Sequence, residues 1–297
     1  MNVVALRAPS AQTLLRLGRV SNLPTVWTNV IAGTTIASTT IASTVASIVD
    51  VALVGLAMTA FYVGGMYLND FFDRDIDARE RPGRPIHAGD ISASAVSAIG
   101  FALLAVCVAL LAPFGLLTAI LGLALAGAIV LYDAWHKGNV FAPVIMGLCR
   151  ALIYLVTGAV VSGEIRFALI AGAVALATHV IGLTYAAKQE NLNQVGRLWP
   201  LAILAGPLLL AVPGISSGWP VVVGCLLLVA ADIAAVRLLA KRAAPDAVPR
   251  AVSMLIAAIC LVDALAVVLY GGGILLACIC ASGYLLTRLF QTVIPGT

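Results

Sequence analysis

The sequence has little charge. Charged residues make up 10% of its 297 residues, against about 25% in ordinary soluble domains. Hydrophobic residues make up 62%, and the mean hydropathy is +1.09. A soluble globular protein is therefore excluded. Several stretches of about 20 apolar residues predict membrane-spanning helices, because lipid offers no water to satisfy an exposed backbone.

The chain also lacks the signs of secretion and of zinc binding. No small-residue cleavage site follows a short apolar core, so we expect no removable signal peptide. The cysteines have neither zinc-ligand spacing nor a place in a loop, and we expect small buried hydrophobes at Cys107, Cys149, Cys225, Cys260, Cys278 and Cys280. The sequence shows no polar domain or linker, so residues 1–297 are predicted to form one helical domain, with no nucleic-acid partner and an oligomeric state that the sequence does not define.

The apolar stretches predict an all-α integral membrane protein with nine to ten transmembrane helices in one bundle. The expected spans are residues 22–43, 51–72, 92–112, 114–134, 141–161, 165–187, 198–212, 218–241, 250–270 and 274–290. The seventh is short and contains Pro200 and Pro207. Only Gly271, Gly272 and Gly273 separate the ninth from the last, so 274–290 is either an additional span or the end of a broken ninth. Residues 1–20 are expected to form a cytoplasmic interfacial segment.

Lysine and arginine are distributed very unevenly. If the spans alternate, fifteen of the 17 basic residues fall on one side, all but Arg150 and Arg166. Because basic loops favour the cytoplasm, we place both termini and the loops 73–91 and 188–197 there, in what we take to be a bacterial plasma membrane. The opposite loops are short and almost uncharged. A site for a charged substrate is therefore expected on the cytoplasmic side.

The densest polar stretch runs from Tyr67 to Pro85 and holds five of the 13 acidic residues, together with four arginines. On a helix, Asp70, Asp73 and Asp77 are spaced i, i+3, i+7 and share one face. Three like charges on one stripe repel each other unless a cation lies between them, and carboxylate oxygens at this spacing suit Mg²⁺. The alternative is a solvated interfacial loop whose acids and arginines neutralise each other.

Two further features extend this pattern. Arg81 and Arg84 fit an anionic ligand, because guanidinium grips phosphate with paired hydrogen bonds. After the sixth span, Glu190, Asn193 and Arg197 are again at i, i+3, i+7. One carboxylate and one amide are enough for a second, poorer metal shell; an ordinary helix end is the alternative.

The end of the fourth span allows two interpretations. Asp133 and Lys137 are at i, i+4 and can form a routine surface ion pair, with Tyr132 as an interfacial aromatic. In the functional interpretation, Lys137 contacts a phosphate while Tyr132 or Asp133 faces the reacting carbon.

Ionisable residues also occur within the spans. Arg150 lies inside the fifth, where a charge is costly unless it faces a cavity or a partner. Asp232 and Asp263 are intramembrane acids, and either is a candidate counter-ion, so that Arg150 is either functional or half of a structural pair. His179 is expected to make a hydrogen bond between helices.

These residues resemble a known family. Asn69-Asp70-x-x-Asp73-x-x-x-Asp77 is similar to the first aspartate-rich motif of the UbiA superfamily of intramembrane prenyltransferases. The same resemblance extends over about residues 14–270 and includes Arg81-Pro82-x-Arg84-Pro85, the opening Arg19-Val20-Ser21-Asn22-Leu23-Pro24-Thr25, where Val20 replaces a common proline, and the Tyr132…Lys137 pair.

The resemblance implies a nine-helix bundle around a central cavity that is open laterally to lipid. An isoprenoid diphosphate would be held by Mg²⁺ at its cytoplasmic end. The implied metal ligands are Asp70, Asp73, Asp77 and Glu190, and the implied catalytic residues are Asp70, Asp73, Asp77, Tyr132 and Lys137. The implied substrate-binding residues are Asn22, Asn69, Arg81, Arg84, Arg150, Lys188, Glu190, Asn193 and Arg197.

The second aspartate-rich motif departs from the family pattern. That motif usually has two aspartates four residues apart, but here it reads Lys188-Gln189-Glu190-Asn191-Leu192-Asn193, with one acid. This argues against a complete second Mg²⁺ site. Either Lys188 replaces part of the metal charge, or this branch uses an unusual donor or acceptor.

The implied function is Mg²⁺-dependent transfer of a prenyl group from an isoprenoid diphosphate to a small, aromatic acceptor within the membrane, with release of pyrophosphate. The alternatives are a UbiA-type terpene cyclase, in which no acceptor enters, and phosphoribosyl transfer to polyprenyl phosphate. A transporter or channel would place polar residues along its spans, whereas here they crowd at one end.

Overall fold

The computed structural model describes residues 9–40, 47–188, 197–240 and 246–296. These residues form helices joined by short loops. In chain order the helices are α1 (Ala11–Leu17), α2 (Leu23–Thr40), α3 (Ile48–Phe72), α4 (Arg74–Glu80), α5 (Ala93–Leu111), α6 (Leu116–Trp135), α7 (Ala142–Ser162), α8 (Phe167–Lys188), α9 (Gly206–Ala211), α10 (Trp219–Ala240), α11 (Ala247–Leu269) and α12 (Ile274–Phe290).

The predicted all-α membrane fold is confirmed. Within the described residues, 8 helical segments are long and apolar enough to cross a membrane. The first and last predicted spans, α2 and α12, are not among them, although each forms a helix at the expected place. Helix α12 is apolar but short, and α2 is rich in threonine. Their membrane location follows from packing against the other helices rather than from hydropathy alone.

The seventh predicted span is helical but not one continuous α-helix. It consists of a 3₁₀ helix (Trp199–Ala205), the short α9 and a second 3₁₀ helix (Val212–Ser217). Pro200, Pro207 and Pro213 lie at the starts of these pieces. Each proline removes a backbone donor, so each marks a break in the α-helical hydrogen-bond ladder.

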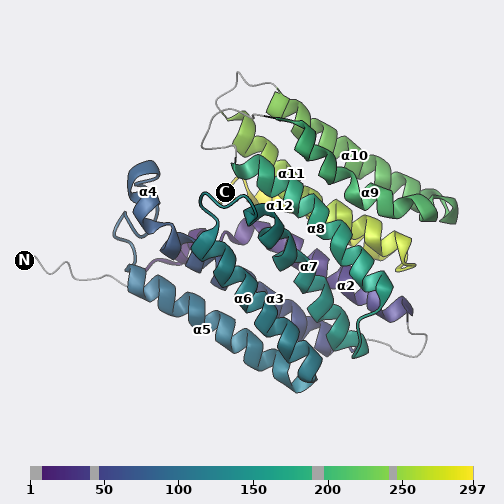
Figure 1. Cartoon of the computed structure of the whole chain (residues 1–297), viewed down its shortest axis with the longest axis horizontal. Helices are drawn as coiled ribbons and strands as arrows, with labels where there is room; N and C mark the ends of the chain where they lie inside the picture. The colour runs from purple at the N-terminus through teal and green to yellow at the C-terminus, as the bar shows by residue number, and fades with distance from the viewer. Residues whose placement is uncertain (1–8, 41–46, 189–196, 241–245, 297) are drawn as a thin grey trace, which may run out of the picture.

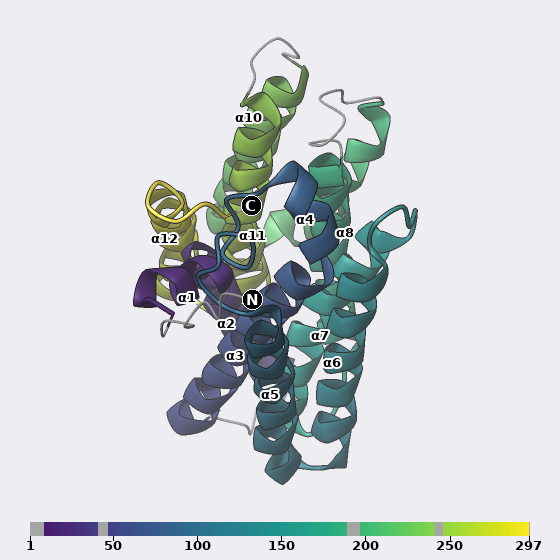
Figure 2. The same ribbon diagram turned by 90° about the vertical axis from the view of Figure 1, so that its left-hand side faces the viewer.

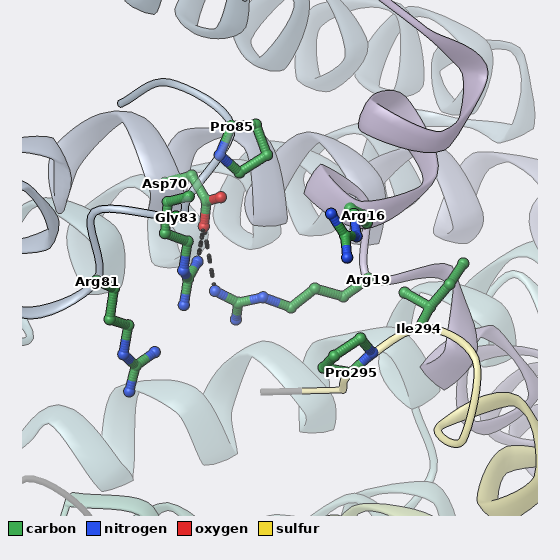
Figure 3. Close-up of a pocket in the computed structure, with 9 residues that line it drawn as sticks. Arg16, Arg19, Asp70, Arg81, Gly83, Pro85, Ile294 and Pro295 are labelled. Carbon is green, nitrogen blue, oxygen red and sulfur yellow. Dashed lines mark hydrogen bonds and ion pairs between the residues drawn. The ribbon is translucent and has the colours of Figure 1, made fainter. Parts of the chain in front are cut away.

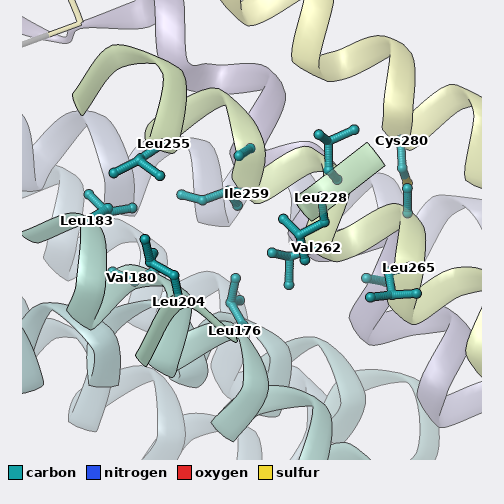
Figure 4. Packing of buried hydrophobic residues seen from close by; sticks show 14 of the residues in the cluster. Leu176, Val180, Leu183, Leu204, Leu228, Leu255, Ile259, Val262, Leu265 and Cys280 are labelled. Atoms are coloured by element: carbon teal, nitrogen blue, oxygen red, sulfur yellow. The ribbon is translucent and has the colours of Figure 1, made fainter. Parts of the chain in front are cut away.

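Helix α2 runs through the middle of the bundle and packs against α3, α7, α8, α11 and α12. Helices α3, α5 and α6 lie on one side in Figure 1, and α9 and α10 lie on the other. The larger hydrophobic core is formed where α8, α10 and α11 meet, and includes Leu176, Leu228 and Val262 (Figure 4). Close approach of α7 and α8 requires Gly147, because a Cβ there would lie 3.0 Å from the carbonyl oxygen of Ala177.

The acidic stripe lies at a break between two helices rather than on one. Helix α3 ends at Phe72, Asp73 is the capping residue, and α4 starts at Arg74. The Asp73 backbone stays in the right-handed region, with its N–H bonded to the Asn69 carbonyl at 2.9 Å. The local register is therefore nearly helical, and the side chains of all three stripe aspartates are buried. Figure 2 looks onto this end of the bundle, where α1, α4 and the C-terminus gather; we call it the site end.

Candidate functional site

A cavity of about 210 Å³ opens at the site end and contains many of the sequence-predicted residues. Its polar lining includes Asn22, Asn69, Asp73, Arg81, Arg84, Tyr132 and Arg150. Its apolar lining comes mainly from α3, α7, α8 and α11, with Met66, Met146, Val180, Leu183, Ile256 and Ile259. We call it the central cavity. It combines charged groups that can hold an anion with an apolar wall that can hold a hydrocarbon.

Asp70 is held between two guanidinium groups. An Arg19 Nη2 lies 3.2 Å from Asp70 Oδ1, and Arg84 Nη1 donates to the same oxygen. Arg19 also donates to Asn69 Oδ1 at 3.0 Å. Its backbone is left-handed (φ 41°), and it is the only non-glycine residue with positive φ in the described part of the chain. Backbone strain of this kind concentrates at functional sites, and here it accompanies an arginine that reaches the stripe.

Asp73 is held by groups from the end of α6. His136 Nε2 lies 3.4 Å and Lys137 Nζ 3.5 Å from its two oxygens. Burial alone would raise the pKa of Asp73, but hydrogen bonds and charge from His136 and Lys137 outweigh it, so this pKa is lowered. The pKa of Asp77 is instead raised, by burial and by the neighbouring aspartates, against the opposing effect of Arg84. Asp73 is therefore held firmly in its charged form, and Asp77 less so.

The surface ion pair between Asp133 and Lys137 does not form, because Lys137 pairs with Asp73. Asp133 is buried and accepts a hydrogen bond from Asn69 Nδ2 at 3.2 Å, while its Oδ2 has no hydrogen-bond partner among the described residues. Tyr132 lines the central cavity and stacks on His136, with ring centroids 5.0 Å apart. The end of α6 thus contributes to the site itself.

Arg150 lines the central cavity but does not bind either candidate counter-ion directly. Its Nη1 donates to Asn29 Oδ1 at 2.9 Å, and the amide of Asn29 donates to Asp263. The other candidate, Asp232 on α10, has an oxygen 3.9 Å from His179 Nδ1 on α8. The interhelical hydrogen bond expected for His179 is confirmed, since its Nε2 lies 3.0 Å from the carbonyl oxygen of Leu255 on α11.

The second motif is only partly visible. Glu190 and Asn193 lie outside the described residues, so their predicted roles stay predictions. Lys188 donates to the backbone carbonyl of Asn139, and it does not line the central cavity. Arg197 is exposed, and its carbonyl accepts a hydrogen bond from Tyr185 at 2.9 Å. These contacts fit a helix end better than a diphosphate clamp.

Two site residues were missed by the sequence-based list. Arg19 was identified in the opening motif but not as a partner of the stripe, and His136 was not singled out. A histidine one residue before the predicted phosphate-binding Lys137 was the available signal. Arg19 could be found only through its three-dimensional proximity to Asp70.

The donor set of the stripe fits Mg²⁺ in one restricted sense. Among the described residues, no three or more His, Cys, Asp or Glu side chains gather closely enough to hold a metal by themselves. Mg²⁺ usually needs only one or two carboxylates, with waters and substrate phosphates as its other ligands. Asp70 and Asp73 offer oxygens of this kind beside the central cavity. They would hold Mg²⁺ jointly with a phosphate-bearing substrate rather than as a protein-only cage.

The C-terminal segment lies at the mouth of this site. Asn22 Nδ2 donates to the carbonyl of Gly296 at 3.0 Å, and Gln291 Nε2 donates to Asn22 Oδ1 at 3.0 Å. Gly296 lines the central cavity, while Ile294 and Pro295 line a neighbouring pocket (Figure 3). Both polar atoms of the Asn22 side chain are therefore engaged by this segment.

Comparison with solved structures gives matches with similar folds. One described as "Structural and mechanistic insights into the biosynthesis of Digeranylgeranylglyceryl phosphate synthase in membranes" shares 19% identity, with 87% of this chain and 98% of that chain covered and a TM-score of 0.63. An apo UbiA homolog from Aeropyrum pernix K1 shares 15% identity over 84% of this chain and 97% of that chain, with a TM-score of 0.64. A UbiA homolog from Archaeoglobus fulgidus shares 14%, over 94% and 99%, with a TM-score of 0.53.

A UbiA homolog from Archaeoglobus fulgidus has also been solved bound to GPP and Mg²⁺ and to DMAPP and Mg²⁺. These structures match with TM-scores of 0.47 and 0.46 and identities of 12% and 16%, so their ligands describe that protein alone. No curated protein matches the chain.

The family itself is identified by sequence. The pattern of the UbiA prenyltransferase family matches residues 26–257, which include the whole acidic stripe, Tyr132 and Arg150. This match covers most of the chain and agrees with the fold and with the lining of the central cavity. The protein belongs to the UbiA prenyltransferase family.

Proposed function

We propose that this UbiA-family enzyme transfers a prenyl group from an isoprenoid diphosphate to a small acceptor and releases pyrophosphate. One observation carries the proposal. Asp73 and three arginines (Arg19, Arg81, Arg84) line the charged end of a cavity whose remaining wall is mainly apolar, and two of these arginines hold Asp70 beside it. This arrangement suits a ligand with a diphosphate head and a hydrocarbon chain.

The arginines are placed to exchange partners when the substrate binds. In the free protein, Arg19 and Arg84 neutralise Asp70. A diphosphate is a stronger, bidentate partner for guanidinium, so we expect both arginines to turn toward it and to leave Asp70 free to bind a cation. Mg²⁺ would supply neutralisation of the leaving pyrophosphate.

Departure of the pyrophosphate leaves an allylic cation that needs shelter from water. The methionine, valine, leucine and isoleucine side chains of the central cavity provide an apolar wall. The ring of Tyr132 faces the same cavity and can stabilise a cation through its π-system. Asp133, with one buried oxygen lacking a hydrogen-bond partner in the described part of the chain, is placed to accept the proton that the acceptor loses.

The space available to the acceptor lies around Asp133 and in the central cavity. The aromatic acceptor expected from the sequence stays a prediction, because the central cavity and the side pocket of about 70 Å³ beside Asp133 admit small acceptors of several kinds. The relative described as a digeranylgeranylglyceryl phosphate synthase suggests a non-aromatic acceptor as the second candidate.

The deciding experiment uses the purified protein and a panel of isoprenoid diphosphates, with and without aromatic or glycerophosphate-lipid acceptors and with Mg²⁺ or EDTA. We expect product masses equal to acceptor plus prenyl group, formed only with Mg²⁺. A cyclic hydrocarbon or cyclic alcohol formed equally well without any acceptor would favour a cyclase. A separate incubation with a phosphoribosyl donor and polyprenyl phosphate tests the second alternative, which transfer between these two would support.

The orientation of the site also belongs to the proposal. The basic residues of the loops 73–91 and 188–197 favour the cytoplasmic side. Single cysteines introduced at Gly83 and at Arg197 into a cysteine-free background should react with an impermeant maleimide only in inverted vesicles. Labelling in intact cells would reverse the orientation.

A further inference from the structure

A pocket rich in arginine lies beside the central cavity. It has a volume of about 270 Å³ and is lined by Arg16, Arg19, Arg81 and Arg84, with Asp70 as its single acid (Figure 3). Three of these arginines also line the central cavity, but Arg16 does not. We call this the arginine pocket. Its excess of positive charge suits an anion.

Arg16 differs from Arg19 and Arg84 of this pocket because its side chain is not paired with an acid of the described residues. It lies in the last turn of α1, and its side chain is exposed. In the described part of the chain, the Arg16 guanidinium has no hydrogen-bond or ion-pair partner. Arg19 and Arg84, by comparison, share one carboxylate. An incoming anion would therefore gain a cation that no group in residues 9–40, 47–188, 197–240 and 246–296 neutralises.

An apolar groove begins where the arginine pocket ends. It lies between α2 and α12, has a volume of about 760 Å³, and shares Ile294 with the arginine pocket. Its walls include Trp27, Ile31 and Ile279, with few polar atoms. We call it the α2–α12 groove. An apolar groove of this size on membrane-spanning helices suits a hydrocarbon chain.

We propose that the arginine pocket and the α2–α12 groove together bind an anionic phospholipid of the bilayer, with the phosphate at Arg16 and an acyl chain in the groove. Charge complementarity favours this occupant, since basic pockets between membrane helices recognise anionic head groups and guanidinium grips phosphate oxygens. The groove belongs to the outer face between α2 and α12, not to the central cavity, and α12 lies outside the residues that match the family pattern. The lipid is therefore a neighbour of the reaction site, not its substrate.

The test compares two lipids that differ in net charge. The detergent-solubilised protein is mixed with phosphatidylglycerol or phosphatidylcholine, and the retained lipid is counted by native mass spectrometry. We expect phosphatidylglycerol to be retained preferentially. Removing one basic charge near a lipid phosphate should weaken that retention about fivefold, so Arg16→Gln should lower it by this factor. Arg237→Gln, which removes an exposed charge at the end of α10, is the matched control and should retain lipid like the wild type.

The groove is tested separately. Ser282 is exposed and lines the groove, so Ser282→Phe should obstruct the acyl chain and reduce retention of phosphatidylglycerol. Leu285→Phe, on the exposed face of α12 outside the groove, is the control. Gel filtration and thermal unfolding of each variant monitor folding.

Three outcomes would overturn the proposal. The first is Arg16→Gln retaining phosphatidylglycerol as well as the wild type does. The second is equal retention of both lipids. The third is displacement of phosphatidylglycerol by stoichiometric geranyl diphosphate or by inorganic phosphate, which would assign the arginine pocket to the prenyl donor or to a free anion.

Discussion

The interior of the bundle and its site end each bury a carboxylate, and the two carboxylates have different partners. Asp263, in the interior, accepts hydrogen bonds from Thr28 at 2.5 Å, from Asn29 at 2.9 Å and from Tyr154 at 2.7 Å. These donors are short or ring-bearing side chains on α2 and α7, fixed by packing. Because these donors are neutral and fixed in place, an anionic substrate would not draw them away from the Asp263 carboxylate.

At the site end, Asp70 has two long, charged partners instead. Arg19 and Arg84 reach it with flexible side chains, and both also line the central cavity. A phosphate can attract these charged arginines away from Asp70. The three donors around Asp263 carry no net charge, so a phosphate has no such attraction for them. The difference separates an acid that holds helices together from an acid that is available for binding.

The largest expected effect is on the interior acid. Asp263→Ala should lower the free energy of unfolding by about 3 to 5 kcal/mol, because a buried hydrogen-bonded network loses its common acceptor. Thermal unfolding in detergent measures this. Asp232→Ala is the matched control: Asp232 is also intramembrane, but its Oδ1 has no hydrogen-bond partner among the described residues, so its removal should cost little. Equal losses in both variants would mean that the hydrogen bonds to Asp263 do not stabilise the fold.

The corresponding change at the site end should affect activity and not folding. Asp70→Asn should reduce turnover of the isoprenoid diphosphate by about 10²–10³, because stabilisation of the leaving pyrophosphate is lost. Its unfolding temperature should stay close to that of the wild type. Asp75→Asn serves as control, since Asp75 lies on the adjoining short helix α4, its side chain is 83% exposed, and it pairs only loosely with Arg74. An Asp70→Asn variant with normal turnover and unchanged Mg²⁺ requirement would contradict the metal role.

A smaller effect is expected for the cation that holds Asp73. Lys137→Met should raise the KM for the isoprenoid diphosphate about tenfold, because Asp73, which lines the central cavity, loses the charge-assisted contact that holds it. We expect a smaller change in kcat. Steady-state kinetics at saturating Mg²⁺ test this. A pure loss of kcat would mean that Lys137 acts on the reaction rather than on binding.

The smallest effect is expected at the end of α8. Lys188→Met should change KM by less than about twofold, since the Lys188 ammonium bonds to the Asn139 carbonyl and lies outside the lining of the central cavity. The same kinetic assay applies. A loss comparable to that of Lys137→Met would restore Lys188 as a diphosphate contact and with it the second half-site.

Sequence reasoning was most successful where a single helix or a hydropathy pattern carries the information. The apolar spans gave the all-α membrane bundle, and the spacing of the aspartates gave the acidic stripe, although the stripe crosses a helix break at Asp73. The partners of the stripe could not be derived in this way. Arg19 and His136 come from the segment before α2 and from the end of α6, and only the packing of these elements brings them to Asp70 and Asp73.

Interactions within the membrane were harder still to predict. Sequence alone offered both Asp232 and Asp263 as counter-ions for Arg150, because hydropathy shows that an acid is buried but not which helix it faces. In the structure, Asn29 mediates between Arg150 and Asp263. An amide that links two charged groups leaves no periodic signal in the sequence. The linking role of Asn29 could therefore be recognised only from the packing of the helices.

The polarity of α2 has a consequence for the biogenesis of this protein. Its Thr28 and Asn29 bond to Asp263, which lies 235 positions after Thr28 in the chain and is synthesised with the eleventh helix. While the ribosome is still making the intervening helices, the Thr28 hydroxyl can bond only to the Thr25 carbonyl of α2 itself, and the Asn29 amide lacks its acceptor Asp263. The helix is also not apolar enough to count among the candidate membrane spans of the described residues. We therefore expect α2 to stay beside the insertion machinery, or in contact with its neighbours α3 and α7, until α11 emerges. Truncated nascent chains crosslinked from Thr28 should lose contact with the translocon only when α11 is included.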